Sequence, residues 1–157
     1  FSIVEQMNGK VTVDRVKGEL LVEESEKLDG GEFDLKDSPD LLPVVSILAL
    51  KARSTVIING ISHARFKETD RVRNITTELR KLGATVTETY DSIAIQPPAV
   101  LKNASLESFD DHRLFMALAI ASLMTNNSTL NGAQSVDVSY PSFIDDLTNM
   151  GANISIC

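Results

Sequence analysis

Apolar side chains recur with helical steps between residues 72 and 82, at Val72, Ile75, Leu79 and Leu82. Steps of three and four residues place side chains on one face of an α-helix, whereas a half-buried strand alternates every second residue. This segment is therefore predicted to form an amphipathic helix with one buried stripe. Its charged residues should lie on the first turn and on the outer face.

A second pattern is repeated three times along the chain. In each copy a helix ends at a large apolar residue, a turn containing glycine follows, and a strand with alternating polarity begins; the copies span residues 5–13, 80–87 and 148–155. Glycine just beyond a helix end accommodates the left-handed conformation that terminates the helix. Alternation is typical of a strand with one face in water.

Another helix–strand pair precedes two of these copies. The pairs are an apolar helix at 40–50 with a strand at 54–60, and an apolar helix at 111–124 with a strand at 128–132. A further strand is predicted at 92–96, before Pro97 and Pro98 end the pattern. The polar stretch 23–31 is predicted to be a hairpin or loop.

These elements define an α/β (α+β) fold built from repeated helix–strand–helix–strand–strand units. We expect one domain over residues 1–157, divided into a repeat tail at 1–36 and two repeats at 37–98 and 99–157. The helix around residues 114–121 is apolar on nearly all sides, which implies burial against several neighbours. The helices should therefore form a buried layer with the sheets outside.

Composition narrows the possible partners. The 157-residue chain has a formal net charge of −7, which argues against a general nucleic-acid binder. It has no apolar run of about 18 residues that could span a membrane, and residues 1–6 do not form a signal peptide, so we expect a cytoplasmic protein. One cysteine, Cys157, and two histidines argue against a structural zinc site, and we expect neither a metal nor another cofactor.

Charged residues are concentrated at the start of the predicted helix. Residues 65–73 hold four basic and two acidic side chains: Arg65, Lys67, Arg71, Arg73, Glu68 and Asp70. Glu68 and Asp70 suit a helix start, whose dipole favours anions, but cations in a first turn need compensation. Two explanations remain open: ion pairs on a solvated face, or an anionic ligand bound by basic side chains and unpaired backbone N–H groups.

Two other predicted helix starts carry polar groups. Asp40 and Asp111 each suit a helix N-cap, and His112 taken alone is typical of a satisfied structural histidine. Arg113 stands in the first turn of a strongly apolar helix. Both the helix dipole and poor hydration disfavour a cation there unless an anion meets it.

Repeats related by pseudo-symmetry bring equivalent helix starts to the same end of a domain. The side chains that could then face one cleft are Asp40, Lys67, Glu68, Arg71 and Arg113. Two arginines can hold a carboxylate or phosphate by bidentate hydrogen bonds. Two carboxylates can transfer protons once nearby charges set their protonation states.

Three motifs in this order resemble a known family. Residues 66–71 read Phe-Lys-Glu-Thr-Asp-Arg, residues 38–40 read Ser-Pro-Asp, and residues 110–113 read Asp-Asp-His-Arg. Together they resemble the C-terminal third of the 5-enolpyruvylshikimate-3-phosphate synthases, over essentially the whole chain. The resemblance implies the enolpyruvyl-transferase fold, with two domains of three repeats and the active site between them. This chain would form one wall of the cleft, and the N-terminal domain of the same enzyme would form the other.

The resemblance also implies a reaction. The family transfers the enolpyruvyl group of phosphoenolpyruvate to the 5-hydroxyl of shikimate 3-phosphate, releasing phosphate through a tetrahedral intermediate and without a metal. Asp40 matches a carboxylate at the reacting hydroxyl, and Glu68 matches one near the methylene carbon of phosphoenolpyruvate. Arg71 and Arg113 match residues that clamp phosphoenolpyruvate, and Lys67 matches a lysine of the substrate cleft.

The remaining motif residues have supporting roles in this resemblance. His112 adjoins a clamping arginine, while Asp70 and Asp111 are expected to cap helices or support the arginines. His63 occupies a place where some relatives use an asparagine facing the phosphate of shikimate 3-phosphate, so it is a weak candidate contact. Some members carry a lysine shortly before the proline that matches Pro141, and this chain does not.

Two alternatives stay open. The sister family, UDP-N-acetylglucosamine enolpyruvyl transferase, shares the implied fold, although the Lys-Glu-Thr-Asp-Arg core argues against it. The chain could also be a truncated, non-catalytic domain that binds an anion weakly, because half of the cleft would be missing. In the divided-site interpretation, the isolated chain is expected to be inactive.

Overall fold

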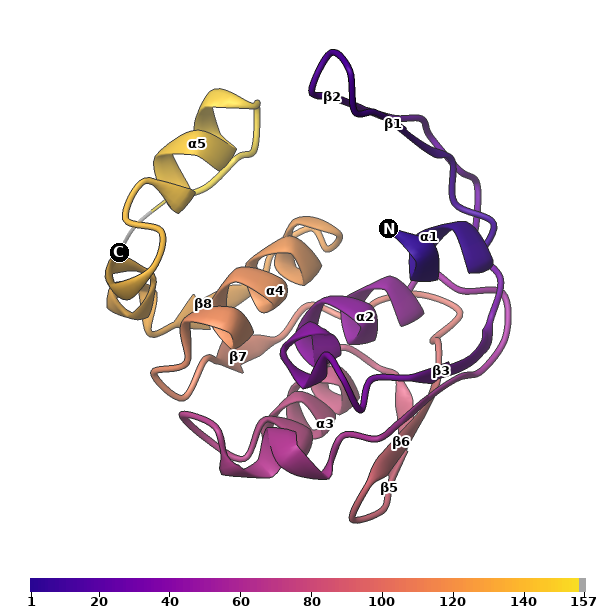
Figure 1. Cartoon of the computed structure of the whole chain (residues 1–157). Helices are drawn as coiled ribbons and strands as arrows, with labels where there is room; N and C mark the ends of the chain where they lie inside the picture. The colour runs from indigo at the N-terminus through magenta and orange to yellow at the C-terminus, as the bar shows by residue number, and fades with distance from the viewer. Residues whose placement is uncertain (156–157) are drawn as a thin grey trace.

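Two strand–helix–strand units with the same topology organise the fold, which the computed structural model describes over residues 1–155 (Figure 1). The elements of these units are β3 (Gly31–Asp34), α2 (Leu42–Ala49) and β4 (Val56–Asn59), then β7 (Ser105–Glu107), α4 (His112–Leu123) and β8 (Thr129–Asn131). Each unit pairs its two strands in parallel, which the intervening helix makes possible.

A helix and an antiparallel hairpin follow the first unit. These are α3 (Arg71–Lys81), β5 (Thr85–Glu88) and β6 (Ser92–Gln96), which complete a four-stranded sheet in the order β3-β4-β6-β5. The chain begins with the same combination: α1 (Ser2–Gln6), β1 (Val11–Asp14) and β2 (Glu19–Val22). After β8 come the 3₁₀ helix η3 (Ala133–Val138) and α5 (Phe143–Asn149). The division into repeats at residues 36/37 and 98/99 stays a prediction.

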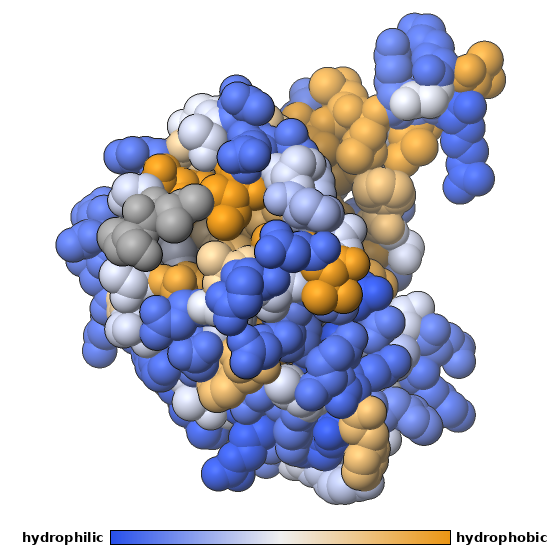
Figure 2. Space-filling view, turned by 90° about the vertical axis from the view of Figure 1, so that its left-hand side faces the viewer, coloured by the Kyte–Doolittle hydropathy of each residue, from blue (hydrophilic) through white to orange (hydrophobic). Residues whose placement is uncertain are grey.

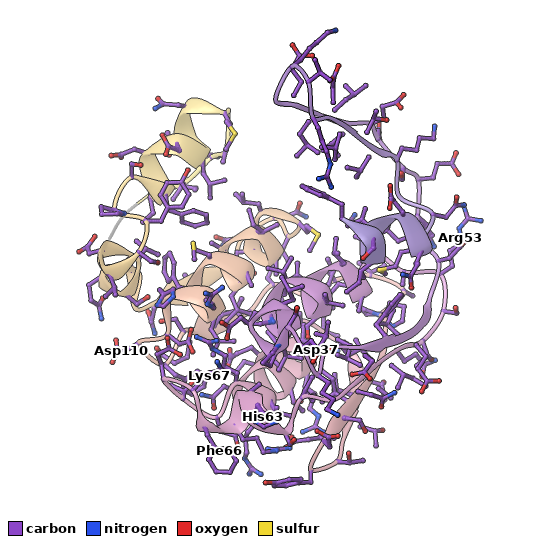
Figure 3. All side chains as sticks on the ribbon, in the orientation of Figure 1. Asp37, Arg53, His63, Phe66, Lys67 and Asp110 are labelled. Carbon is purple, nitrogen blue, oxygen red and sulfur yellow. The ribbon has the colours of Figure 1, made fainter. Side chains whose placement is uncertain are left out.

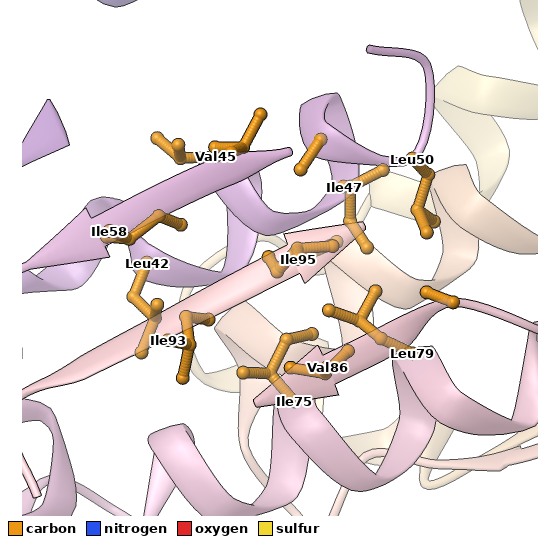
Figure 4. Packing of buried hydrophobic residues seen from close by; sticks show 14 of the residues in the cluster. Leu42, Val45, Ile47, Leu50, Ile58, Ile75, Leu79, Val86, Ile93 and Ile95 are labelled. Carbon is orange, nitrogen blue, oxygen red and sulfur yellow. The ribbon is translucent and has the colours of Figure 1, made fainter. Parts of the chain in front are cut away.

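The core lies between the four-stranded sheet and the helices α2 and α3. Alternate residues of β4, β6 and β5 point inward, as the two-residue period of a strand requires. Figure 4 shows this layer, in which Ile58, Ile93 and Ile95 pack against Leu42 and Ile75. All five of these side chains are fully buried. The sheet therefore covers one side of the helices, as the sequence predicted.

The apolar stripe predicted for the helix α3 is confirmed. Val72, Ile75, Leu79 and Leu82 all have 0% exposure. The helix ends at Lys81, and Gly83 beyond it adopts the left-handed φ of +99°. Gly151 does the same after α5, with φ +98°. These two turns follow the predicted mechanism of helix termination.

The turn after α1 ends the helix differently. Here Asn8, and not the neighbouring glycine, takes the left-handed conformation, with φ 59°. Asparagine tolerates this region better than most residues. A Cβ on Gly9 would lie 2.5 Å from Cγ1 of Val4, so Gly9 serves close packing against the helix.

The sequence predictions missed β3 and β7, and one predicted strand is absent. β3 was not predicted, because its short sequence carries two acidic residues and lies beside a polar stretch; its pairing with β4 stabilises it. Residues 152–155 were predicted to begin a strand but have none assigned. Across the described residues no strand pairs with this segment, and the N–H of Ala152 instead donates to the carbonyl of Leu147. Strand conformation needs such a partner. Residues 156–157 lie outside the described part.

Apolar side chains also remain exposed on α2, α4 and the β1–β2 hairpin. On α4, Ile120 and Leu123 are each 40% exposed, and Val44 on α2 is 53% exposed. Leu21 and Val22 of the β1–β2 hairpin are also exposed. Figure 2 shows apolar residues along a segment that extends from the body at the upper right, with hydrophilic residues at its outer end. The expected burial of the helices on several sides is therefore incomplete at these positions.

Candidate active site

Three short segments bring the predicted site residues together. Asp40 lies in the 3₁₀ turn η1 (Pro39–Leu41), Lys67 and Glu68 lie between η2 (Ser62–Phe66) and α3, and Arg113 lies in the first turn of α4. The N-cap prediction for Asp40 was wrong. The helix α2 begins only at Leu42, without a side-chain cap, because the Pro39 turn places Asp40 ahead of the helix start.

Arg71 is the centre of this cluster, and its side chain is only 1% exposed. Its Nε donates to Asp111 Oδ2 at 2.6 Å, and its Nη2 donates to Asp111 Oδ1 at 3.2 Å. Nη1 donates to Asp40 Oδ1 at 2.8 Å, and Nη2 also donates to Glu68 Oε2 at 2.5 Å. One buried guanidinium therefore joins three carboxylates from three segments.

Asp111 supports Arg71 and caps α4 at the same time. Its Oδ1 accepts the backbone N–H groups of Arg113 at 2.9 Å and Leu114 at 3.2 Å. The side chain is fully buried, so both the cap and the arginine compensate its charge. Asp70 caps α3 in the same way, accepting from Arg73 N at 3.0 Å. Both predicted caps are confirmed.

Asp40 faces three cations. Besides Arg71, Lys67 Nζ lies 3.3 Å from its Oδ1 and Arg113 Nη2 lies 3.5 Å from its Oδ2. Partial burial opposes ionisation of this carboxyl, but the hydrogen bond from Lys67 and the charges of Arg113, Lys67 and Arg71 outweigh it. The pKa of Asp40 is therefore lowered from its ordinary value of 3.8. At neutral pH Asp40 is a carboxylate that can accept a proton.

The cluster has an outer layer of partly exposed charged side chains and an inner pair of buried ones. The side chains of Asp40, Glu68, Lys67 and Arg113 are between 34% and 46% exposed, whereas those of Arg71 and Asp111 lie beneath them. Water-accessible carboxylates and cations thus lie above the buried ion pair of Arg71 and Asp111. Such an arrangement can bind an anion through the cations and transfer protons through the carboxylates.

The structure corrects two expectations about the cations. Arg71 lies in the first turn of α3, as expected, but it does not lie on an outer face, because its carboxylate partners hold it in the interior and Asp111 lies 40 residues away. Its ion pairs are therefore neither wholly local nor on a solvated face. Arg113 was expected to be poorly hydrated and to need an anion; Asp40 Oδ2 lies 3.5 Å from its Nη2, as expected, but the Arg113 side chain is 43% exposed.

The two histidines lie near the cluster without an ion pair to it in the described part of the chain. His63 is exposed on η2, where Asp91 is a charged neighbour. His112 is half-buried as the first residue of α4. Figure 3 shows His63, Phe66 and Lys67 along the η2 turn, with Lys67 on the side of Asp110. A contact of either histidine with substrate stays a prediction.

Sequence reasoning missed two features of the site. Arg65 was noted only as part of a basic run, yet it makes five side-chain hydrogen bonds and is 12% exposed. Phe109 and Asp110 both adopt positive φ, 55° and 57°, directly before Asp111. Neither is glycine, so this turn had no recognisable sequence signal.

Within residues 1–155, no group of three or more His, Cys, Asp or Glu side chains is arranged to hold a metal ion. In the same range, every helix is too short or too polar to cross a membrane. The expected absence of a metal or other cofactor stays a prediction.

Known proteins are similar in sequence to this chain over nearly its whole length. The family model described as EPSP synthase (3-phosphoshikimate 1-carboxyvinyltransferase) matches residues 1–147. A 3-phosphoshikimate 1-carboxyvinyltransferase of Nitrosopumilus maritimus is 43% identical over 154 residues, which cover 98% of this chain and 36% of that protein. The protein of the same name from Methanosarcina acetivorans is 40% identical over 151 residues, 96% of this chain and 35% of its own length.

Solved structures share the fold. An EPSP synthase of Acinetobacter baumannii superposes with a TM-score of 0.85 at 27% identity, over 96% of this chain and 38% of that one. The enolpyruvyl transferase NikO of Streptomyces tendae has a TM-score of 0.81 at 20% identity, over 99% of this chain and 35% of that one, and shows the fold alone.

The repeated α/β architecture is thus that of the enolpyruvyl transferases. The chain belongs to the EPSP synthase family, as the sequence resemblance indicated. It spans about a third of the length of the curated relatives that it matches.

Proposed function

We propose that this chain forms one wall of the active site of an enzyme that transfers the enolpyruvyl group of phosphoenolpyruvate to the 5-hydroxyl of shikimate 3-phosphate. Membership of the EPSP synthase family supports this reaction over transfer to a nucleotide sugar. The observation that carries the proposal is the pair of exposed carboxylates, Asp40 and Glu68, held by one buried arginine. A cytoplasmic location and a place in aromatic amino acid biosynthesis belong to the same proposal.

Asp40 and Glu68 would divide the proton transfers. Asp40 takes the proton of the 5-hydroxyl while that oxygen bonds to C2 of phosphoenolpyruvate. Glu68, which has first taken up a proton from solvent, gives that proton to C3. In the elimination step, Glu68 takes a proton back from C3 as the double bond re-forms. The bond between C2 and the phosphate oxygen breaks, and its electron pair leaves with phosphate. A single carboxyl can serve as acid and then as base.

The lowered pKa of Asp40 keeps this carboxyl ionised, and it also makes the carboxylate a weaker base. Three cations surround its carboxylate, so it is ionised before substrate arrives. A general base must be deprotonated at the working pH to accept a proton. Lys67 and Arg113 are also the more exposed cations, which fits them to meet an anionic substrate first.

Arg71 has a different place in the proposal. Its Nε and Nη2 donate to Asp111, and its two terminal nitrogens donate to Asp40 and Glu68. A direct clamp on phosphoenolpyruvate would use the second N–H of Nη1, or it would displace Asp40 or Glu68 from Arg71. Such a displacement would couple substrate binding to release of a proton-transferring carboxylate.

The remainder of the protein would supply the N-terminal domain and the other wall of the cleft. The curated relatives are almost three times as long as the matched segment, which supports this division. The exposed apolar residues on α2 and α4 are also consistent with further protein covering them.

The test is turnover of the full-length enzyme with Glu68→Gln, measured as phosphate release from phosphoenolpyruvate and shikimate 3-phosphate. We expect turnover to fall by about a hundredfold or more, the usual contribution of general acid–base catalysis, with substrate binding retained. Glu24→Gln is the matched control, because Glu24 is exposed in a loop far along the chain from the cluster. Near-normal turnover of Glu68→Gln would contradict the proton-transfer role.

The isolated chain distinguishes the non-catalytic alternative. We expect residues 1–157 alone to release no phosphate, and the full-length enzyme to release it. Robust turnover by the isolated chain would contradict the divided site. Absence of turnover in the full-length wild-type protein would instead favour a domain that only binds an anion.

A further inference from the structure

Arg65 makes five side-chain hydrogen bonds at the edge of the site. Its Nε donates to the carbonyl of Tyr90 at 2.8 Å, and its Nη2 donates to the carbonyl of Thr89 at 2.6 Å and to Glu88 Oε1 at 2.8 Å. Nη1 donates to both oxygens of Asp70, at 2.9 and 3.2 Å. Three of these acceptors belong to the end of β5 and the turn after it.

These bonds close a loop that carries two of the site residues. Arg65 precedes Lys67 and Glu68, and Asp70 follows them, so the ion pair between Arg65 and Asp70 joins the two ends of the loop. Asp70 is in turn the N-cap of α3, whose first residue is Arg71. The position of the loop and the start of the helix therefore depend on the same guanidinium.

A second contact fixes the other end of η2 to the same turn. Ser62 N donates to Asp91 Oδ1 at 2.6 Å, and Ile61 N donates to the carbonyl of Asp91 at 3.2 Å. The η2 segment is thus attached to the β5–β6 turn at both of its ends. Lys67 and Glu68 project from a segment anchored on the sheet and not from a free loop.

The charge of Arg65 is well suited to this role. Burial opposes it, but the hydrogen bonds to Glu88 and Asp70 raise the pKa of Arg65 above its ordinary value. Its planar group donates from all three nitrogens in fixed directions. A lysine would keep the charge but could not reproduce this fork geometry.

We propose that Arg65 is a positioning residue for the proton transfer, because it holds the loop bearing Lys67 and Glu68 against the cap of α3. This inference rests on the proposed role of Glu68. Arg65 itself acts through its protein contacts and not on substrate. A displacement of about 1 Å at a reacting group can cost about a hundredfold in rate.

The experiment compares Arg65→Lys with Arg80→Gln in the full-length enzyme. Arg80 lies near the other end of α3, and its Nε and Nη2 donate to the carbonyl of Val86, so its variant also loses side-chain bonds to β5. We expect Arg65→Lys to lower kcat by about tenfold to a hundredfold with KM values within about threefold of wild type. Arg80→Gln should leave kcat within about twofold.

A double variant distinguishes positioning from a general loss of stability. If Arg65 acts through Glu68, Arg65→Lys should lower kcat no further in the Glu68→Gln background, because the two effects share one step. Independent, multiplying effects would overturn the inference. So would a kcat of Arg65→Lys equal to that of Arg80→Gln.

Asp70→Asn provides a second route to the same contact. Asparagine still caps a helix but removes the charge that pairs with Arg65, so kcat should fall while α3 keeps its start. If Arg65→Lys does not fold, unchanged kcat in Asp70→Asn overturns the inference. Near-normal turnover of Glu68→Gln would instead refute the proposed function, which separates the two failures.

Discussion

Arg71 and Asp111 form a two-point ion pair across 40 residues of sequence, with both side chains almost completely buried. The pair joins the first turn of α3 to the cap of α4. Two consecutive helices thus share one charged contact at the same end of the domain. The exposed carboxylates, Asp40 and Glu68, are attached to this contact through the same arginine.

Asp111→Asn tests how far the buried pair stabilises the fold. Asparagine can still cap α4, so the substitution mainly leaves the guanidinium of Arg71 without a buried counter-charge. We expect the full-length protein to lose about 3 kcal/mol of unfolding free energy, measured by urea denaturation. Asp37→Asn, at an exposed position, should change it by less than about 0.5 kcal/mol. Equal effects of the two substitutions would show that the pair is energetically unimportant.

The strained turn before Asp111 gives a second prediction. Asp110 has φ 57° and accepts a hydrogen bond from Gln134 Nε2 at 2.9 Å. Asp110→Gly relieves the left-handed conformation but removes this exposed bond, so stability should change by less than about 1 kcal/mol. Asp110→Val should lose about 1–2 kcal/mol, since a β-branched residue is poorly tolerated there. Equal melting temperatures for the two variants would argue against strain.

The lowered pKa of Asp40 predicts a pH dependence with a definite sign. Its folded-state pKa lies below 3.8, so the unfolded state binds the proton more readily. The stabilisation from Asp40 is therefore present above pH 3.8 and is lost as the pH falls through the folded-state pKa. The stability difference between wild type and Asp40→Asn should be constant from pH 5 to 7, because this interval lies about one unit or more above 3.8. The difference should shrink as the pH falls below 3.8. A difference that grows on acidification would contradict the assignment.

Arg113 should affect substrate binding more than stability. Its ion pair with Asp40 is exposed, and such pairs contribute little to folding, about 0–1 kcal/mol. Loss of a charged hydrogen bond to phosphoenolpyruvate would raise its KM by about tenfold to a hundredfold in Arg113→Ala. Steady-state kinetics and thermal unfolding of the full-length enzyme measure the two effects. A large fall in melting temperature with unchanged KM would place Arg113 among the structural residues instead.

Local patterns predicted most of the helices and several strands. The apolar stripe of α3 was sufficient to predict that helix, and β6 has the predicted bounds, Ser92–Gln96. Asp70 and Asp111 were recognisable as caps because each precedes a helix with an oxygen that can accept its first N–H groups. These features depend on residues close in sequence, so the sequence alone carries the signal.

Long-range contacts determined what sequence reasoning missed. β3 is short and polar, and it forms because β4 lies beside it. The burial of Arg71 depends on Asp111 on another helix, and the fork of Arg65 depends on the backbone of Thr89 and Tyr90. The periodicity of a short segment does not predict partners that are distant in sequence, because these residues become neighbours only when the sheet and helices assemble.

The most direct test of the central claim follows the proton at C3 of phosphoenolpyruvate. The full-length enzyme is incubated with both substrates in deuterium oxide, and deuterium in the vinyl groups of product and recovered phosphoenolpyruvate is measured by mass spectrometry. Wild type and Glu24→Gln should incorporate solvent deuterium, and Glu68→Gln with both substrates bound should incorporate it at least about a hundredfold more slowly. Incorporation by Glu68→Gln at the wild-type rate would show that another group transfers this proton.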